Sequence, residues 1–232
     1  MIDITPCPSP NFAARPIGQP VDILLMHYTG MRTAGEALDR LCDARARVSS
    51  HYTIDEEGTI YGHVSEEYCA FHAGISYWAG ARDINARSIG IEIVNPGHEF
   101  GYRAFPDLQI EAVITLSKDI LGRHHVPRER VIGHSDVAPA RKSDPGELFP
   151  WVRLAGEGVG LWPAEAAPEL DCTFEAGLRR FGYGIQPDAD PSFEQVSMAF
   201  QRHFRTSRVD GVADGECERI LAGLLTALDA KP

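Results

Sequence analysis

Apolar positions in the first part of the chain follow two patterns, short unbroken runs and longer stripes at helical spacing. The runs at 21–27 and 131–133 and the alternating segment at 88–95 predict strands. Stripes that recur every three to four residues predict helices over about 33–47 and 106–124. Strands and helices are therefore expected to be interleaved along this part of the chain.

Three further segments complete this part. Residues 1–20 are rich in proline and predict an extended N-terminal arm. Residues 51–55 and 59–64 predict a hairpin across a turn that contains Gly58. Residues 66–87 are rich in aromatic side chains but lack periodicity, and a loop of this length in a compact domain is more often functional than idle.

The pattern changes after residues 152–170, which are rich in glycine, alanine and proline. We place a linker at 156–170, between one domain at 21–155 and a second at 171–232. Helical spacing in the second domain predicts three short helices, the middle one opened by a capping box that begins at Ser192. Three helices of this length predict a small bundle, near the lower size limit for independent folding.

Composition narrows the class of protein. Hydrophobic residues make up 44% and charged residues 24% of the chain, as in ordinary soluble globular proteins. The net charge is −11, from 22 basic and 33 acidic residues. Nucleic acid and anionic membrane surfaces both attract basic patches, so neither is expected as the main partner. No stretch approaches the length of a transmembrane helix, so membrane insertion is not expected.

The cysteines and the N-terminal segment indicate the cellular compartment in which the protein is expected. Five scattered cysteines without a CxxC pair predict neither a thiolate zinc site nor a disulfide framework. The N-terminus lacks the basic and apolar regions of a signal peptide. Both observations favour the cytoplasm, and the alternative is the periplasm or cell envelope with a leader removed. The sequence does not predict the oligomeric state.

Two histidines each end an apolar run, and an aspartate follows in a loop. His27 and His134 would lie at one rim if their strands are neighbours, and Asp144 comes ten residues after His134. Imidazole nitrogen and carboxylate oxygen are ordinary zinc ligands, and a catalytic zinc takes three ligands from the protein. These residues form a candidate metal site. On spacing alone, a histidine at a strand end is more often a hydrogen-bonded packing residue.

Glu92 is a carboxylate among apolar neighbours in the predicted strand at 88–95. Alternate isoleucines of this strand share one face, and Glu92 points from the other. Burying a carboxylate costs several kcal/mol unless it is paired. Position alone supports equally a structural ion pair and a general base beside a cation.

Five segments, in this order, resemble a known family: HYT, SSHYTIDEEGTIYGHV, FHAG, NARSIGIEIVN and GHSDVAPARKSDPGELFPW. They are similar to the zinc-dependent N-acetylmuramoyl-L-alanine amidases of the type-2 amidase family, which share their fold with peptidoglycan-recognition proteins. The resemblance covers about 21–151, and its last segment is the most specific. Near the C-terminus, LRRFGYG, AFQRHFR and VDGVADGE resemble the three-helix peptidoglycan-binding domain that is often attached to such amidases. The alternative is that this bundle no longer binds the polymer and is a packing element against the catalytic domain.

The resemblance implies a fold and a set of roles. The fold is α/β, a central mixed β-sheet flanked by helices, with the three-helix bundle added. His27, His134 and Asp144 match the zinc ligands. Glu92 matches the catalytic carboxylate, and Lys142 matches a lysine that assists at the reacting carbonyl. Without the resemblance, Lys142 would be interpreted as a solvated loop residue.

The implied reaction is hydrolysis of the amide between N-acetylmuramic acid, or its 1,6-anhydro form, and L-alanine. The expected partners are peptidoglycan or muropeptide fragments. His72, Arg82 and Asn85 lie where the family's substrate groove runs, so they are candidate substrate contacts.

Two other functions are open alternatives. One is a recognition module that binds muropeptides without cutting them, and the other is a metallopeptidase that cuts within the stem peptide. Recognition proteins of this kind typically lose a zinc ligand, whereas this chain has all three. The HExxH, GxSxG and P-loop motifs are absent, so the common protease, esterase and nucleotide-binding interpretations have no support.

Overall fold

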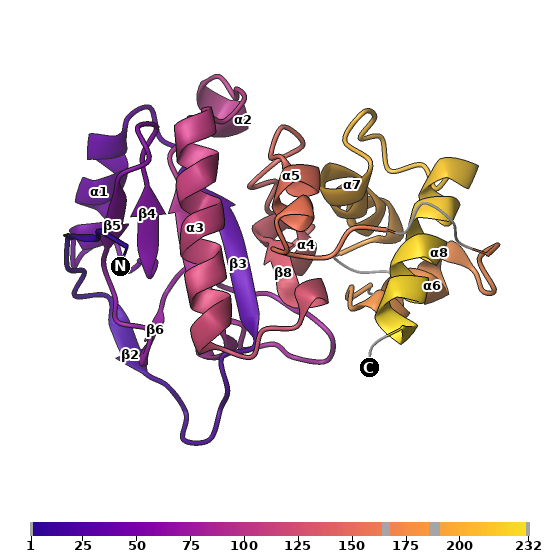
Figure 1. The fold of residues 1–232 in the computed structure, drawn as a ribbon, viewed down its shortest axis with the longest axis horizontal. Coiled ribbons are helices and arrows are strands. Elements are labelled where there is room, and N and C mark those ends of the chain that lie inside the picture. Colours follow the sequence, from indigo (N-terminus) through magenta and orange to yellow (C-terminus); the bar gives the residue numbers. More distant parts are fainter. Residues whose placement is uncertain (1, 164–167, 186–190, 231–232) are drawn as a thin grey trace.

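The computed structural model describes residues 2–163, 168–185 and 191–230. Its centre is a six-stranded mixed β-sheet (Figure 1). In spatial order, the strands are β1 (Thr5–Pro6), β5 (Ile60–Gly62), β4 (Tyr52–Ile54), β7 (Ser88–Ile93), β3 (Ile23–Tyr28) and β8 (Val131–Gly133). Strands β4, β7, β3 and β8 run parallel, whereas β5 is antiparallel to β4. The predicted strands and the hairpin are confirmed.

The proline-rich arm is extended, as predicted, and it pairs with strands from later in the chain. β1 runs parallel to β5 at one edge of the central sheet. β2 (Phe12–Ala14) pairs antiparallel with β6 (Tyr68–Ala70) in a separate two-stranded sheet. The rest of 66–87 is mainly irregular and ends in a 3-10 helix at Asn85–Arg87. The arm therefore ties this long loop to the body of the protein.

Helices flank the sheet, which confirms the predicted α/β class. α1 (Ala34–Cys42) ends earlier than predicted, because the chain turns to an extended conformation at Asp43. α3 (Asp107–Arg123) lies along the sheet as predicted, and a 3-10 helix at Arg128–Arg130 precedes β8 (Figure 1). Three helices were not predicted, because each has only four to six residues and shows no periodicity: α2 (Gly97–Phe100), α4 (His134–Val137) and α5 (Trp151–Gly156).

The three predicted C-terminal helices are present and gather beyond β8 (Figure 1): α6 (Phe174–Phe181), α7 (Phe193–Phe204) and α8 (Gly215–Asp229). Their first turns are capped by Thr173, Ser192 and Asp214. At Ser192 both hydrogen bonds of the predicted capping box form with Gln195. Caps of this kind satisfy backbone N–H groups that lack a partner within the helix.

Side-chain alternation along β3 divides the core in two. Leu24 and Met26 face one hydrophobic cluster that also contains residues of α3. Ile23 and Leu25 face a second cluster, which α6, α7 and α8 complete. Because side chains alternate between the faces of a strand, His27 lies on the same face as Ile23 and Leu25.

The C-terminal helices thus share a hydrophobic core with the sheet. Leu25 and Ile132 of the sheet pack in one cluster with Leu178, Phe200 and Leu221. The boundary at 156–170 stays a prediction, and part of it, 164–167, falls outside the described residues. In the part of the chain that the structure describes, no helix has both the length and the apolar character needed to cross a bilayer.

Candidate metal centre and active site

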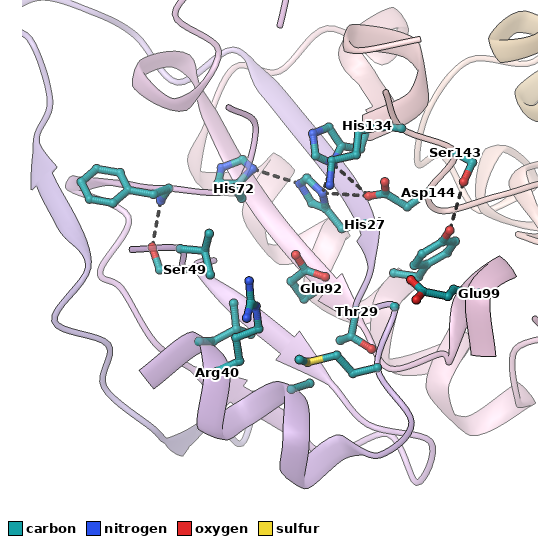
Figure 2. Close-up of a pocket in the computed structure, with 18 of the residues that line it drawn as sticks. His27, Thr29, Arg40, Ser49, His72, Glu92, Glu99, His134, Ser143 and Asp144 are labelled. Atoms are coloured by element: carbon teal, nitrogen blue, oxygen red, sulfur yellow. Dashed lines mark hydrogen bonds and ion pairs between the residues drawn. The ribbon is translucent and has the colours of Figure 1, made fainter. Parts of the chain in front are cut away.

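The three candidate metal ligands meet at the carboxyl ends of β3 and β8 (Figure 2). The Nδ1 atoms of His27 and His134 lie 2.9 Å apart. Oδ2 of Asp144 lies 3.1 Å from Nδ1 of His27 and 3.0 Å from Nδ1 of His134. All three side chains are buried. His27 therefore converges on one point with two residues that follow it by more than a hundred positions.

The hydrogen bond made by Nε2 of each imidazole determines which tautomer of the ring is present. Nε2 of His134 lies 3.0 Å from the carbonyl oxygen of Ala73 and must donate to it. Nε2 of His27 lies 3.0 Å from Nδ1 of His72, and Nε2 of His72 lies 3.3 Å from the hydroxyl of Ser88. That hydroxyl donates to a backbone carbonyl, so it accepts from His72, and His72 in turn accepts from His27.

Both ligand histidines therefore present a bare Nδ1 lone pair when they are neutral. Burial, together with the neighbouring His134, lowers the pKa of His27 to about 4, so this ring is neutral near pH 7. Although burial opposes it, the two histidines hold the pKa of Asp144 well below its usual range, so Asp144 is a carboxylate. Two nitrogen lone pairs and one anionic oxygen at this spacing repel one another unless a cation lies between them.

The donor set fits a divalent metal. Bonds of about 2.0–2.2 Å in tetrahedral geometry place ligand atoms about 3.3 Å apart, close to the distances found here. A buried group of His27, His134 and Asp144 is thus able to hold a metal cofactor. Donation from the outer imidazole nitrogens to fixed acceptors is the usual way in which proteins orient such ligands.

Two glycines allow neighbouring groups of the site, His72 and Pro145, to pack directly against the backbone of the sheet. A Cβ at Gly90 of β7 would lie 2.6 Å from the ring of His72, and a Cβ at Gly133 would lie 2.7 Å from Pro145. The amide of Ser135 donates to the carbonyl of Asp144 at 2.9 Å and ties the loop back to the start of α4. These positions need glycine because backbone and rings pack in direct contact.

Glu92 lies beside His27 because the two residues are partners in the register of β7 and β3. Its side chain is half-buried, and within the described residues its Oε2 has no hydrogen-bond partner. Burial and the charge of Asp144 raise its pKa well above the ordinary value, and Lys142 opposes this. A carboxyl group with a raised pKa can both accept and return a proton near neutral pH.

These groups line one cavity of about 530 Å³. Lys142 also lines it and is half-buried, and its charge lowers the pKa of both Glu92 and His27. Figure 2 shows the metal ligands on one side of the cavity and Arg40 of α1 across it. The predicted ligands, Glu92 and Lys142 are therefore brought together.

The three candidate substrate contacts occupy different places. His72 is buried against His27 and lines the cavity. Oδ1 of Asn85 accepts from the amides of His72 and Ala73, so its side chain holds the backbone of this loop. Arg82 is exposed and lies over the ring of Tyr77, outside the residues that line the cavity. Their contact with substrate stays a prediction.

Asp136 is a further residue of the site, which the sequence did not reveal. Its fully buried carboxylate accepts from the amide of Gly133 at 2.7 Å and from Nδ1 of His203 at 2.8 Å. It also accepts from the hydroxyl of Tyr183 at 2.6 Å. The C-terminal helices thereby hold the turn that carries His134. Its position two residues after a ligand was the available signal, but spacing does not reveal partners 47 and 67 residues away.

Comparison with known proteins agrees with this arrangement. The sequence profile of the family described as N-acetylmuramoyl-L-alanine amidase matches residues 17–147, more than half of the chain. The chain belongs to the N-acetylmuramoyl-L-alanine amidase family. An amidase of this family hydrolyses the amide bond between N-acetylmuramic acid and L-alanine, so the predicted activity is confirmed.

Individual amidases are similar over most of the chain. N-acetylmuramoyl-L-alanine amidase AmiD of Escherichia coli is 38% identical over 88% of this chain and 82% of its own. The structure of AmiD in complex with anhydro-N-acetylmuramic acid-L-Ala-D-gamma-Glu-L-Lys has a TM-score of 0.81 at 34% identity, covering 95% of this chain and 99% of that one. AmpDh3 of Pseudomonas aeruginosa in complex with anhydromuramic pentapeptide has a TM-score of 0.81 at 30% identity, covering 98% and 99%.

Replacing His72 by phenylalanine tests its part in orienting His27. Phenylalanine keeps an aromatic ring at this position but cannot accept the N–H of His27. We expect the affinity of the amidase for Zn²⁺ to fall about 10–100-fold, measured by competition with a chromophoric chelator. The control is His125→Phe, which changes an exposed histidine. Equal affinities in the two variants would show that His72 does not orient the ligand.

Proposed function

We propose that this amidase uses zinc, held by His27, His134 and Asp144, to release peptides from N-acetylmuramic acid or its 1,6-anhydro form. The convergence of two imidazole nitrogens and one carboxylate oxygen beside the carboxyl group of Glu92 carries the proposal. Imidazole and carboxylate ligands suit zinc, and three of them leave a position open for catalysis.

The proposed substrates are soluble muropeptides. Two similar amidase structures are complexes with an anhydro-N-acetylmuramic acid peptide and with an anhydromuramic pentapeptide. A cavity of about 530 Å³ that opens beside the ligands is large enough to take one sugar and the first residues of a stem peptide. Peptidoglycan itself is the larger alternative substrate.

The roles of the protein groups follow from their chemistry. Zinc, when bound, supplies a Lewis acid that lowers the pKa of water and polarises the scissile carbonyl. Glu92 takes the proton of the attacking water and passes it to the amine of L-alanine as the C–N bond breaks. His72 and Ala73 hold the two ligand imidazoles in the required orientation.

Lys142 has a separate role at the carbonyl oxygen. Negative charge develops on this oxygen as water adds, and the ammonium group of Lys142, which lines the cavity, stabilises it. Loss of one such donor typically lowers kcat about 10²–10³-fold. The short link to Asp144, two residues later, holds Lys142 near the metal centre.

Chelation tests the proposed function. We expect the amidase to release free stem peptide from anhydro-muropeptide, to lose this activity after treatment with a chelator, and to regain it with Zn²⁺. Mass spectrometry identifies the products and so separates the alternatives. Binding without free peptide would support a recognition module, and cleavage between residues of the stem would support a peptidase.

A further inference from the structure

Two cysteines meet near β1, at the edge of the central sheet opposite β8. Sγ of Cys7, in the N-terminal arm, lies 3.1 Å from Sγ of Cys42, the last residue of α1. Non-bonded carbon atoms pack best at roughly 3.5–4.0 Å, and sulfur is larger than carbon. The two thiols are therefore closer than ordinary packing would place them. Both are partly exposed, so a reagent in solution can reach them.

The fold holds each cysteine in place independently of the other. The amide of Cys7 donates to Gly62 of β5 at 2.9 Å, which continues the pairing of β1. The hydroxyl of Ser9 donates to the backbone carbonyl of Leu41 at 2.5 Å. The side-chain amide of Asn11 donates to the backbone carbonyl of Asp43 at 2.9 Å. The arm thus runs along the end of α1, with the two sulfur atoms facing each other.

A metal site is the alternative explanation, because His63 lies beside the two thiols. Nδ1 of His63 lies 2.7 Å from the carbonyl of Cys7 and must donate to it, so it has no lone pair for a metal. Nε2 lies 2.8 Å from the hydroxyl of Thr53. Two thiolates on zinc would lie about 3.8 Å apart, farther than the thiols do here. The geometry favours a bond between the sulfur atoms.

We propose that Cys7 and Cys42 are the site of a disulfide bond. The oxidant is a small-molecule disulfide. The sulfur of one cysteine displaces one thiol from it and forms a mixed disulfide, and the sulfur of the other cysteine then displaces the second thiol. One disulfide is reduced, one is formed, and the two protons of the cysteines leave on the released thiols.

The crosslink has a consequence for the catalytic cavity. Ala37, Arg40 and Leu41 of α1 line that cavity, and Leu41 precedes Cys42. A covalent bond at the end of α1 therefore fixes one wall of the proposed substrate site. Structural disulfides persist in oxidising compartments, so this bond favours the periplasm or cell envelope over the cytoplasm.

Peptide mapping tests the proposal directly. The full-length protein is incubated with oxidised glutathione, alkylated under denaturing conditions without reductant, digested and analysed by mass spectrometry. We expect a crosslinked peptide pair that contains Cys7 and Cys42 and is two hydrogen atoms lighter than the separate peptides. Both cysteines alkylated, or both carrying glutathione, would overturn the proposal.

Thermal unfolding gives a second test. We expect oxidation to raise the Tm of the wild-type protein by about 5–10 °C, because the crosslink restricts the unfolded chain. Cys42→Ser should abolish this shift, and the control Cys172→Ser should retain it. An equal Tm before and after oxidation, or a second zinc ion that Cys42→Ser removes, would contradict the disulfide. Neither result depends on the amidase reaction.

Discussion

Replacing Glu92 by glutamine is expected to lower kcat by about 10²–10⁴-fold while the protein keeps its metal and its fold. Glutamine has nearly the same shape but neither accepts nor returns a proton. Glu92 adjoins His27 across the sheet, and its Oε2 lacks a partner within the described residues, so no structural ion pair would be broken. The loss should therefore appear in turnover and not in stability.

The measurement is the rate of peptide release at saturating muropeptide, with Tm and metal content determined on the same samples. The control is Glu111→Gln, which changes an exposed carboxylate of α3 on the other face of the sheet. Near-normal turnover in Glu92→Gln would show that another group moves the proton. A large fall in Tm would show that Glu92 has a structural role.

Deleting residues 171–232 is expected to prevent stable folding of the remaining chain. Trp78, only 1% exposed, packs edge-on against Tyr183 with ring centroids 4.9 Å apart. Leu25 and Ile132 belong to the same cluster as the three C-terminal helices. Each large apolar side chain exposed by the deletion costs about 1.5–3 kcal/mol, and several of them together exceed the usual stability of a domain, about 5–15 kcal/mol.

The deletion also leaves Asp136 without Tyr183 and His203, so a buried carboxylate beside His134 loses two of its donors. Tyr183→Phe removes one of these donors with little change in packing, and we expect it to destabilise the protein by about 1–3 kcal/mol. Circular dichroism and thermal unfolding measure both effects. A truncated protein that melts and hydrolyses muropeptide like the full chain would instead support an independent C-terminal domain, as the sequence predicted.

Much of the site could be predicted from the sequence because its residues lie at the ends of apolar runs. His27 and His134 end parallel strands, and parallel strands bring their carboxyl ends to one edge of the sheet. Glu92 was identified as a candidate because burying a carboxylate in a strand costs free energy unless the group is paired. Asp144 was a candidate ligand from its type and spacing, the family resemblance gave Glu92 and Lys142 their roles, and the structure places all five residues around one cavity.

The rest depends on contacts between distant segments. Packing of the C-terminal bundle against the first domain was one of two alternatives, and the sequence did not decide between them, since a glycine- and proline-rich stretch shows a break in pattern and not what packs across it. His72 was expected to face substrate, but its hydrogen bond to His27 depends on the close approach that Gly90 allows. The pairing of Cys7 with Cys42 likewise follows from the path of the arm, which spacing does not show.

Zinc stoichiometry is the most direct test of the metal centre. The wild-type amidase and Asp144→Ala, which removes one ligand but leaves both histidines, are loaded with Zn²⁺, dialysed together and measured by mass spectrometry of the metal. We expect about one zinc ion per chain in the wild type and almost none in the variant, with peptide release following zinc content. Equal zinc in both proteins, or full activity in metal-free wild type, would contradict the proposed centre.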